Sequence, residues 1–305
     1  MLDLRCWMLV KIRPLDMNFR PTSYIQHPTS IRVGVYILLY ILAVRLFAPV
    51  IVWLGGYFAG VTLSQIVAAV VVNWLALRIF GRFHLTDLGL KWNRASMRNL
   101  ALGIAGGMGA AALVLAPPLA VHAAWLAPAG DQAVTWDFFL FTTVLLLAGS
   151  AGEEILFRGF GFQILLQTWG PYTTIFTVGA VFGVLHGANP NSTWLALINT
   201  TAFGILFGYA FLRSGDLWLP IGLHFGWNFT LPLFGVNVSG LTIKLTGHEM
   251  EWSAGTLWSG GEYGPEGSVL TTMVLLALAL YLWKAPVRSQ PSEVFPCAPA
   301  SLSSS

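Results

Sequence analysis

The chain has 305 residues, of which 56% are hydrophobic and 10% are charged, and its formal net charge is +3. A soluble domain carries about a quarter charged residues, so this chain has too few to cover a water-facing surface. The composition excludes an ordinary soluble protein and predicts a polytopic membrane protein. The expected fold class is all-α, a bundle of transmembrane helices.

Apolar runs that are suited to transmembrane helices follow one another along most of the chain, since a span needs about 20 predominantly apolar residues. We predict eight helices, at residues 33–54, 58–80, 99–121, 136–167, 172–187, 194–212, 217–234 and 268–284. The fourth segment is too long for one plain span and the fifth is short. A tilted or broken helix at Gly149–Gly152 is therefore expected.

The predicted organisation is a single integral-membrane domain at residues 33–284, preceded by a cytoplasmic segment at 1–32. A tail follows at residues 285–305 and reads PVRSQPSEVFPCAPASLSSS from its second residue. Its low hydrophobicity and its content of Ser and Pro predict disorder.

Basic residues give the orientation of the helices. The connection with Arg82, Lys91, Arg94 and Arg98 is the most basic in the chain. The positive-inside bias places it in the cytoplasm, and eight crossings then place both chain ends there too. The stretch Gly235–Gly267 becomes an outside loop. We expect a multi-pass protein of the cell membrane, which in a bacterium is the inner membrane.

The stretch GEEILFRG holds three charged residues inside one of the most apolar regions of the chain. Glu154 and Arg158 are four residues apart on one helix face, so they can neutralise one another as a buried pair. Glu153 lies about 100° round the helix from Glu154 and is left over. The alternative is a salt bridge that only packs helices, but charges inside a membrane are functional by default.

Two further stretches, FGVLH and HFGWN, place histidines in apolar helices. The first ends at His186. In the second, His224 and Asn228 are one turn apart, and two such groups on one face can serve one ligand. A hydrogen-bonded packing role is the alternative for a single intramembrane histidine.

In this order on successive apolar helices, E-E-x-x-x-R, F-x-x-x-H and H-x-x-x-N resemble the motifs of the CAAX protease and bacteriocin-processing (CPBP, or Abi) family. The resemblance covers about residues 86–230, if TDLGL at Thr86–Leu90 is counted as the segment that often precedes the family core. It implies an intramembrane endopeptidase similar to the type II CAAX prenyl endopeptidases, with its protease core in these residues.

Peptide hydrolysis needs a base for the water, a group that holds the water, and donors for the oxyanion. Glu153 is the expected base, because a low-dielectric pocket makes a carboxylate a better proton acceptor. His186 would hold the other side of the water. His224 and Asn228 would direct N–H donors at the oxyanion. Glu154 and Arg158 complete the predicted site.

Zinc is the alternative to this glutamate mechanism. His186, His224 and a carboxylate, taken as Glu154, would form a set that suits catalytic zinc with one position open to water. No H-E-x-x-H helix is present, and Asn228 beside His224 fits an oxyanion role. No cofactor is therefore expected.

Two other functions remain open, a proton-coupled transporter and a non-catalytic scaffold such as a bacteriocin self-immunity protein. A transporter predicts polar interruptions in both halves of the chain, whereas they occur in the second half. The expected partners are the lipid bilayer and a peptide or membrane-protein substrate, prenylated or not, and no nucleic acid.

The depths of the two histidines disagree in this topology. At 1.5 Å per residue, His224 lies about 10 Å from the cytoplasmic face and His186 more than about 20 Å from it.

Overall fold

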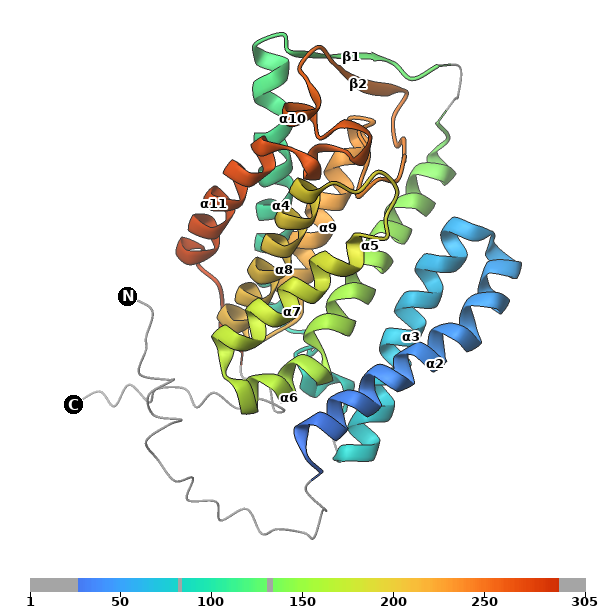
Figure 1. The fold of residues 1–305 in the computed structure, drawn as a ribbon, viewed down its shortest axis with the longest axis vertical. Coiled ribbons are helices and arrows are strands. Elements are labelled where there is room, and N and C mark those ends of the chain that lie inside the picture. The colour runs from blue at the N-terminus through green and yellow to red at the C-terminus, as the bar shows by residue number, and fades with distance from the viewer. Residues whose placement is uncertain (1–26, 82–83, 131–133, 291–305) are drawn as a thin grey trace, which may run out of the picture.

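The computed structural model describes residues 27–81, 84–130 and 134–290. These residues form a helix bundle with one small two-stranded sheet, so the predicted all-α fold is confirmed (Figure 1). The sheet pairs β1 (Ala124–Pro128) with β2 (His248–Trp252) in antiparallel orientation at one end of the bundle. The chain is accordingly a membrane protein built from apolar helices.

Each predicted apolar segment contains a helix. Five stretches are long and apolar enough to cross a membrane: α2 (Thr29–Gly55), α3 (Tyr57–Phe80), α4 (Arg94–Ala120), the run Trp136–Trp169, and α8 (Trp194–Ser214). Shorter apolar helices are α7 (Pro171–His186), α9 (Trp218–Leu233) and α11 (Val269–Lys284). Single-turn helices are η1 (Leu85–Leu88), α10 (Thr256–Ser259), η2 (Gly261–Tyr263) and η3 (Pro265–Gly267).

The long fourth segment is broken, but not where the sequence predicted. It forms α5 (Trp136–Arg158) and α6 (Phe160–Trp169), with the interruption at Gly159. Gly149–Gly152 lies in the uninterrupted part of α5, and Gly152 instead lets α3 approach, since a Cβ there would lie 3.0 Å from the Cα of Ile66. The small residues at this position serve packing, and the prediction of a break there is wrong.

The side chain of Asn73, on α3, explains the break at Gly159. Its Oδ1 accepts the N–H of Phe160 at 2.7 Å, and its Nδ2 donates to the C=O of Ile155 at 3.0 Å. A Cβ at residue 159 would lie 2.2 Å from Asn73 Oδ1, so only glycine fits. One amide thus replaces backbone hydrogen bonds that the interrupted helix cannot make for itself.

Glycines bring α4 and α9 into backbone contact. A Cβ on Gly103 of α4 would lie 2.4 Å from the carbonyl oxygen of Leu219, and one on Gly226 of α9 would lie 2.5 Å from that of Ile104. Small residues at a helix crossing let the backbones approach closely. The helix that carries His224 is therefore held tightly against α4.

The residues after α11 correct the predicted tail. Gln290 donates from Nε2 to Asp216 Oδ2 at 2.6 Å, and Asn99 donates to the same oxygen at 2.7 Å. Residues 285–290 are thus part of the packed bundle, because they satisfy a buried carboxylate, and disorder from residue 285 is wrong for them. Residues 291–305 and most of the segment 1–32 lie outside the described residues.

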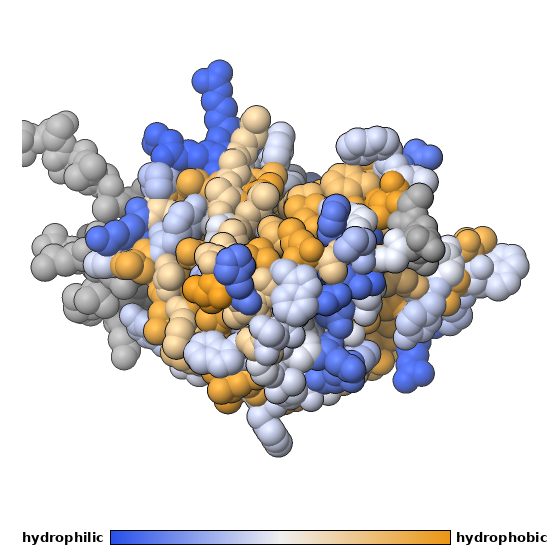
Figure 2. All heavy atoms as spheres, turned by 90° about the horizontal axis from the view of Figure 1, so that it is seen from above, coloured by the Kyte–Doolittle hydropathy of each residue, from blue (hydrophilic) through white to orange (hydrophobic). Residues whose placement is uncertain are grey.

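The loop between α9 and α11 covers the end of the bundle that carries the sheet. Its apolar side chains Val236, Leu245 and Tyr263 are buried against the helices. Seen from this end, hydrophilic side chains lie among apolar ones (Figure 2). This end of the bundle is thus closed by a packed and partly polar layer.

Candidate active site

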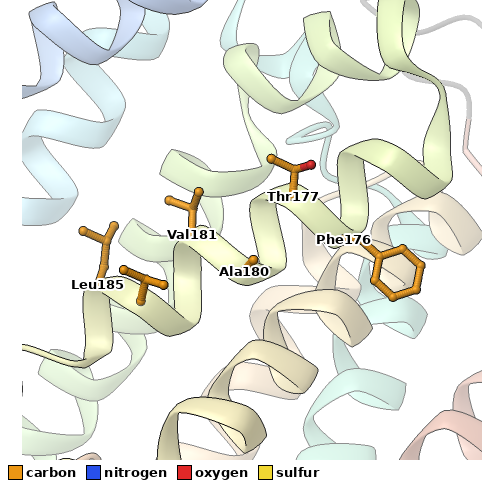
Figure 3. A pocket seen from close by; sticks show the side chains of 6 residues that line it. Phe176, Thr177, Ala180, Val181 and Leu185 are labelled. Carbon is orange, nitrogen blue, oxygen red and sulfur yellow. The ribbon is translucent and has the colours of Figure 1, made fainter.

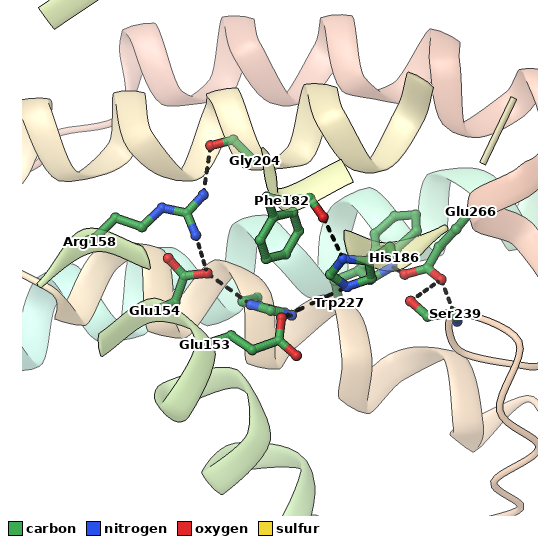
Figure 4. A network of polar contacts seen from close by, with 10 residues as sticks. Glu153, Glu154, Arg158, Phe182, His186, Gly204, Trp227, Ser239 and Glu266 are labelled. Atoms are coloured by element: carbon green, nitrogen blue, oxygen red, sulfur yellow. Dashed lines mark hydrogen bonds and ion pairs between the residues drawn. The ribbon is translucent and has the colours of Figure 1, made fainter. Parts of the chain in front are cut away.

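Three helices carry the predicted site residues. Glu153, Glu154 and Arg158 lie in the last turns of α5, and His186 is the last residue of α7. His224 lies on α9, two turns from its start. The side chains of these residues meet in one polar network inside the bundle (Figure 4).

Glu154 lies on the fully buried side of this network. Its Oε1 accepts from Arg158 Nη1 at 3.1 Å, and both side chains are 0% exposed, so the pair predicted from their spacing is present. Arg158 Nη2 donates to the carbonyl oxygen of Gly204 at 2.7 Å, which ties α5 to α8. Such a pair offsets the cost of burying each charge alone.

Glu153 lies on the more accessible side, with 20% of its side chain exposed. Its Oε2 is 3.9 Å from His186 Nε2 and 3.9 Å from His224 Nε2. Neither distance is a hydrogen bond, and Oε2 is buried without a hydrogen-bond partner among the described residues. Polar groups at such a separation suit a bridging water or ligand atom.

The other ring nitrogen of each histidine has an acceptor. His186 Nδ1 is 2.7 Å from the carbonyl oxygen of Phe182, which can only accept, so Nδ1 carries the hydrogen. His224 Nδ1 is 2.9 Å from Glu154 Oε1. Both Nε2 atoms are thereby directed at Glu153, and a neutral His186 presents a lone pair there.

Aromatic side chains fix the two imidazole rings. Phe182 contacts the His186 ring with a centroid separation of 4.4 Å, and Phe207 stacks on the His224 ring at 4.9 Å. The guanidinium carbon of Arg158 lies 5.2 Å from the centroid of Phe182. The F of F-x-x-x-H thus contributes its ring and its carbonyl oxygen, a role that the sequence did not suggest.

Asn228 is the one predicted site residue that makes no hydrogen bond or ion pair with this network among the described residues. It is half-buried on α9, one turn after His224, and its side chain makes no hydrogen bond within the described residues. Its carboxamide is therefore available to a ligand.

The zinc alternative can be compared with this geometry. Glu154 Oε1 lies at Nδ1 of His224, whereas the carboxylate that faces the Nε2 atoms of His186 and His224 is Glu153. In the described part of the chain, no three His, Cys, Asp or Glu side chains are arranged so that they could hold a metal ion. The carboxylate that the structure brings to the two histidines is therefore Glu153 and not the predicted Glu154, and the metal dependence stays a prediction.

A shallow apolar groove of about 530 Å³ lies along one face of α7. Its lining residues are Phe176, Thr177, Ala180, Val181, Val184 and Leu185, with the last of them adjacent to His186 (Figure 3). The groove has no charged lining residue, so it suits an apolar occupant.

Residues 135–230 match the family model described as "Type II CAAX prenyl endopeptidase Rce1-like". This segment is therefore similar to that family, and we call it the Rce1-like segment. The Rce1-like segment contains all of the predicted site residues, and the resemblance read from the motifs is confirmed over it. It begins at residue 135, later than the predicted core start at residue 86.

A curated relative matches a similar length of chain. The "Uncharacterized protein YyaK" of Bacillus subtilis (strain 168) is 34% identical over 99 residues, which is 30% of this chain and 32% of the relative. The chain thus matches about a third of that relative's length. No solved structure matches the chain.

Several polar residues around the Rce1-like segment were missed by the sequence reasoning. Asn73 and Asn199 are fully buried amides in apolar helices, so the criterion that selected Asn228 could have found them. Glu266 lies in η3 outside any apolar run, and its contact with Trp227 has no signal in the sequence.

Proposed function

We propose that this chain is an intramembrane endopeptidase that hydrolyses a peptide bond of a membrane-associated substrate. The Rce1-like match supports a membrane protease. The observation that carries the catalytic assignment is Glu153 Oε2, a buried carboxylate oxygen without a partner among the described residues that faces two imidazole Nε2 atoms at 3.9 Å. A water bound between these three atoms would be next to a base.

The reaction begins with that water. It donates one hydrogen to Glu153 Oε2 and the other to the Nε2 lone pair of His186, which leaves its oxygen free to attack the carbonyl carbon. Glu153 takes the proton as the C–O bond forms and the carbonyl becomes an oxyanion. The proton then passes to the leaving nitrogen and the C–N bond breaks, which gives a carboxylic acid and an amine. The acid gives its remaining proton to the amine, so a carboxylate and an ammonium group leave.

The oxyanion is assigned to His224 and Asn228. A donor at His224 Nε2 requires that both ring nitrogens carry hydrogen, and carboxylates face both of them. Asn228 supplies a free carboxamide on the same helix. In a water-poor site each donor contributes about 3 kcal/mol to stabilising the transition state. This mechanism needs no metal.

The substrate is proposed to be an apolar or lipidated peptide. The groove lies on α7, the helix that ends at His186, and its lining is apolar, which supports a membrane-associated substrate. The family description adds the CAAX prenyl class, in which a C-terminal cysteine carries a prenyl group.

We further propose that the end opposite the sheet faces the cytoplasm. Basic residues lie where α4 begins and where α8 and α11 end, namely Arg94, Arg213 and Lys284. Asp137 and Glu249 lie at the sheet end. The positive-inside bias favours this orientation, with both chain ends in the cytoplasm, and in a bacterium the membrane is the inner one.

The test uses purified protein in liposomes with a quenched fluorescent peptide that ends in a farnesylated CAAX sequence. Wild-type protein should cleave it, and Glu153→Gln protein should not, although both insert equally. An unprenylated peptide of the same sequence tests the lipid requirement. Failure of the wild type on both peptides, or equal cleavage by the variant, would favour a transporter or a non-catalytic scaffold.

A further inference from the structure

Glu266 is a second buried carboxylate, outside the Rce1-like segment and 6% exposed. Its Oε1 accepts from Trp227 Nε1 at 3.0 Å, and its Oε2 accepts from the hydroxyl of Ser239 at 2.7 Å and from the backbone N–H of the same residue (Figure 4). Among the described residues, no Lys or Arg pairs with it. Burying a carboxylate with only neutral hydrogen-bond donors costs free energy, so we expect this carboxylate to serve a function.

Its partner Trp227 belongs to the H-F-G-W-N stretch, between His224 and Asn228. The indole is 2% exposed and packs on Phe203 at 4.7 Å. Phe203 contacts Phe207 at 5.8 Å, and Phe207 stacks on His224. Trp227 and His224, both on α9, therefore pack against two adjacent aromatic side chains of α8. A contact that holds the indole in place also holds the face of α9 that carries the proposed oxyanion donors.

The backbone of Glu266 is fixed separately, on α8. Asn199 donates from Nδ2 to the carbonyl oxygens of Glu266 at 2.8 Å and of Ser268 at 2.9 Å. The Asn199 Oδ1 accepts from the hydroxyl of Thr272 at 2.8 Å, which adds α11. Glu266 thus links α9, through its side chain, to a point held by α8 and α11.

We propose that Glu266 is a positioning residue for the hydrolytic site. Through the Trp227 indole it sets the rotation and height of α9, so that His224 Nε2 and the Asn228 carboxamide converge on one oxygen atom. The inference rests on the proposed function. A misplacement of about 1 Å from a change far from the chemistry can cost about 100-fold in rate, so one outer-loop contact can control turnover.

The test compares the same substitution at two carboxylates of one loop. Glu266→Gln keeps the volume and one acceptor oxygen, but its NH₂ group would face the Ser239 N–H, so it cannot satisfy both partners. Glu249→Gln is the control, because Glu249 pairs with Lys244 and is about a third exposed (34%). In the liposome assay, Glu266→Gln should lower kcat by about 10-fold to 100-fold with KM within about two-fold, and Glu249→Gln should change neither.

A double-mutant cycle tests the route of the effect. Trp227→Phe removes the indole N–H and keeps an aromatic ring on Phe203, so it should lower kcat like Glu266→Gln. If both act through one hydrogen bond, the double variant should be no slower than the slower single variant. Fully multiplicative losses, or wild-type kcat in Glu266→Gln protein, would overturn the proposal, even where thermal stability falls.

A second readout needs no substrate. In protein labelled with 5-fluorotryptophan, the fluorine resonance of residue 227 is assigned by its loss in Trp227→Phe protein. It should shift in Glu266→Gln protein and stay in place in Glu249→Gln protein, and an unmoved resonance would overturn the proposal. Absence of cleavage by the wild type would reject the proposed function instead, while this resonance still decides whether Glu266 positions Trp227.

Discussion

Glu153 and Glu154 are neighbours in the sequence, yet α5 directs them to two different regions of the bundle. Glu154 is 0% exposed and shares one oxygen with Arg158 and His224, so a permanent cation compensates its charge. Glu153 is 20% exposed, contacts no Arg or Lys among the described residues, and faces two imidazoles. Two identical side chains thus acquire different chemistry from their surroundings: a compensated carboxylate stabilises the fold, and an uncompensated one can take a proton.

The largest effect should come from Glu153→Gln. The amide keeps the shape but cannot accept the proton, so kcat should fall by about 100-fold to 10,000-fold while the melting temperature stays near that of the wild type. Turnover of the farnesylated peptide measures kcat, and thermal unfolding in detergent measures the melting temperature. Glu154→Gln is the matched change and should lower stability. If Glu153→Gln and Glu154→Gln lowered kcat equally and neither lowered the melting temperature, the two carboxylates would not differ in role.

Arg158→Ala should mainly cost stability. It leaves Glu154 buried without its cation and removes the tie to Gly204, at a cost of about 3–5 kcal/mol. Unfolding followed by intrinsic fluorescence in detergent provides the measurement. Arg158→Lys, which keeps the charge but not the fork of donors, should be intermediate. Wild-type stability combined with lost turnover would make Arg158 part of the chemistry.

Asn228→Ala should show the reverse pattern. The side chain has no hydrogen bond to lose within the described residues, so the free energy of unfolding should change by less than about 0.5 kcal/mol. Turnover should fall by about 100-fold to 1000-fold at nearly constant KM, because an oxyanion donor acts in the transition state. A change in KM alone would point to substrate binding and would contradict the oxyanion role.

The smallest effect should follow metal removal. With Glu153 as the base, exhaustive chelation should leave turnover unchanged and elemental analysis should find no stoichiometric zinc. One zinc per chain, lost together with activity and restored with it, would contradict the metal-free mechanism. His186 and His224 would then be ligands, and Glu153 rather than Glu154 would be the carboxylate that already faces them.

The sequence predicted the apolar segments and the local pair Glu154–Arg158, because helix periodicity relates residues that are close along the chain. The break at Gly159 could not be placed this way, since it depends on Asn73, which is 82 residues from its acceptor Ile155. The contact of Glu266 with Trp227 also joins distant residues.

The conflicting depths of His186 and His224 have a similar origin. The residue count assumed upright helices, whereas α7 runs obliquely from α6 toward the middle of the bundle (Figure 1). An inclined helix gains less height per residue, so its last residue meets α9 nearer to the proposed cytoplasmic face. Tilt is set by packing against other helices and is not encoded in the length of an apolar run.

The amide of Asn73 has a consequence for how the protein is made. Until α3 is in place, the Ile155 C=O and the Phe160 N–H at the interruption would face lipid without partners, and each such group costs several kcal/mol. Synthesis runs from the N-terminus, so the hairpin of α2 and α3 enters the membrane before α5 and α6. The segment of α5 and α6 can therefore form its interruption as it inserts, because the Asn73 side chain that satisfies Ile155 and Phe160 is already in the bilayer.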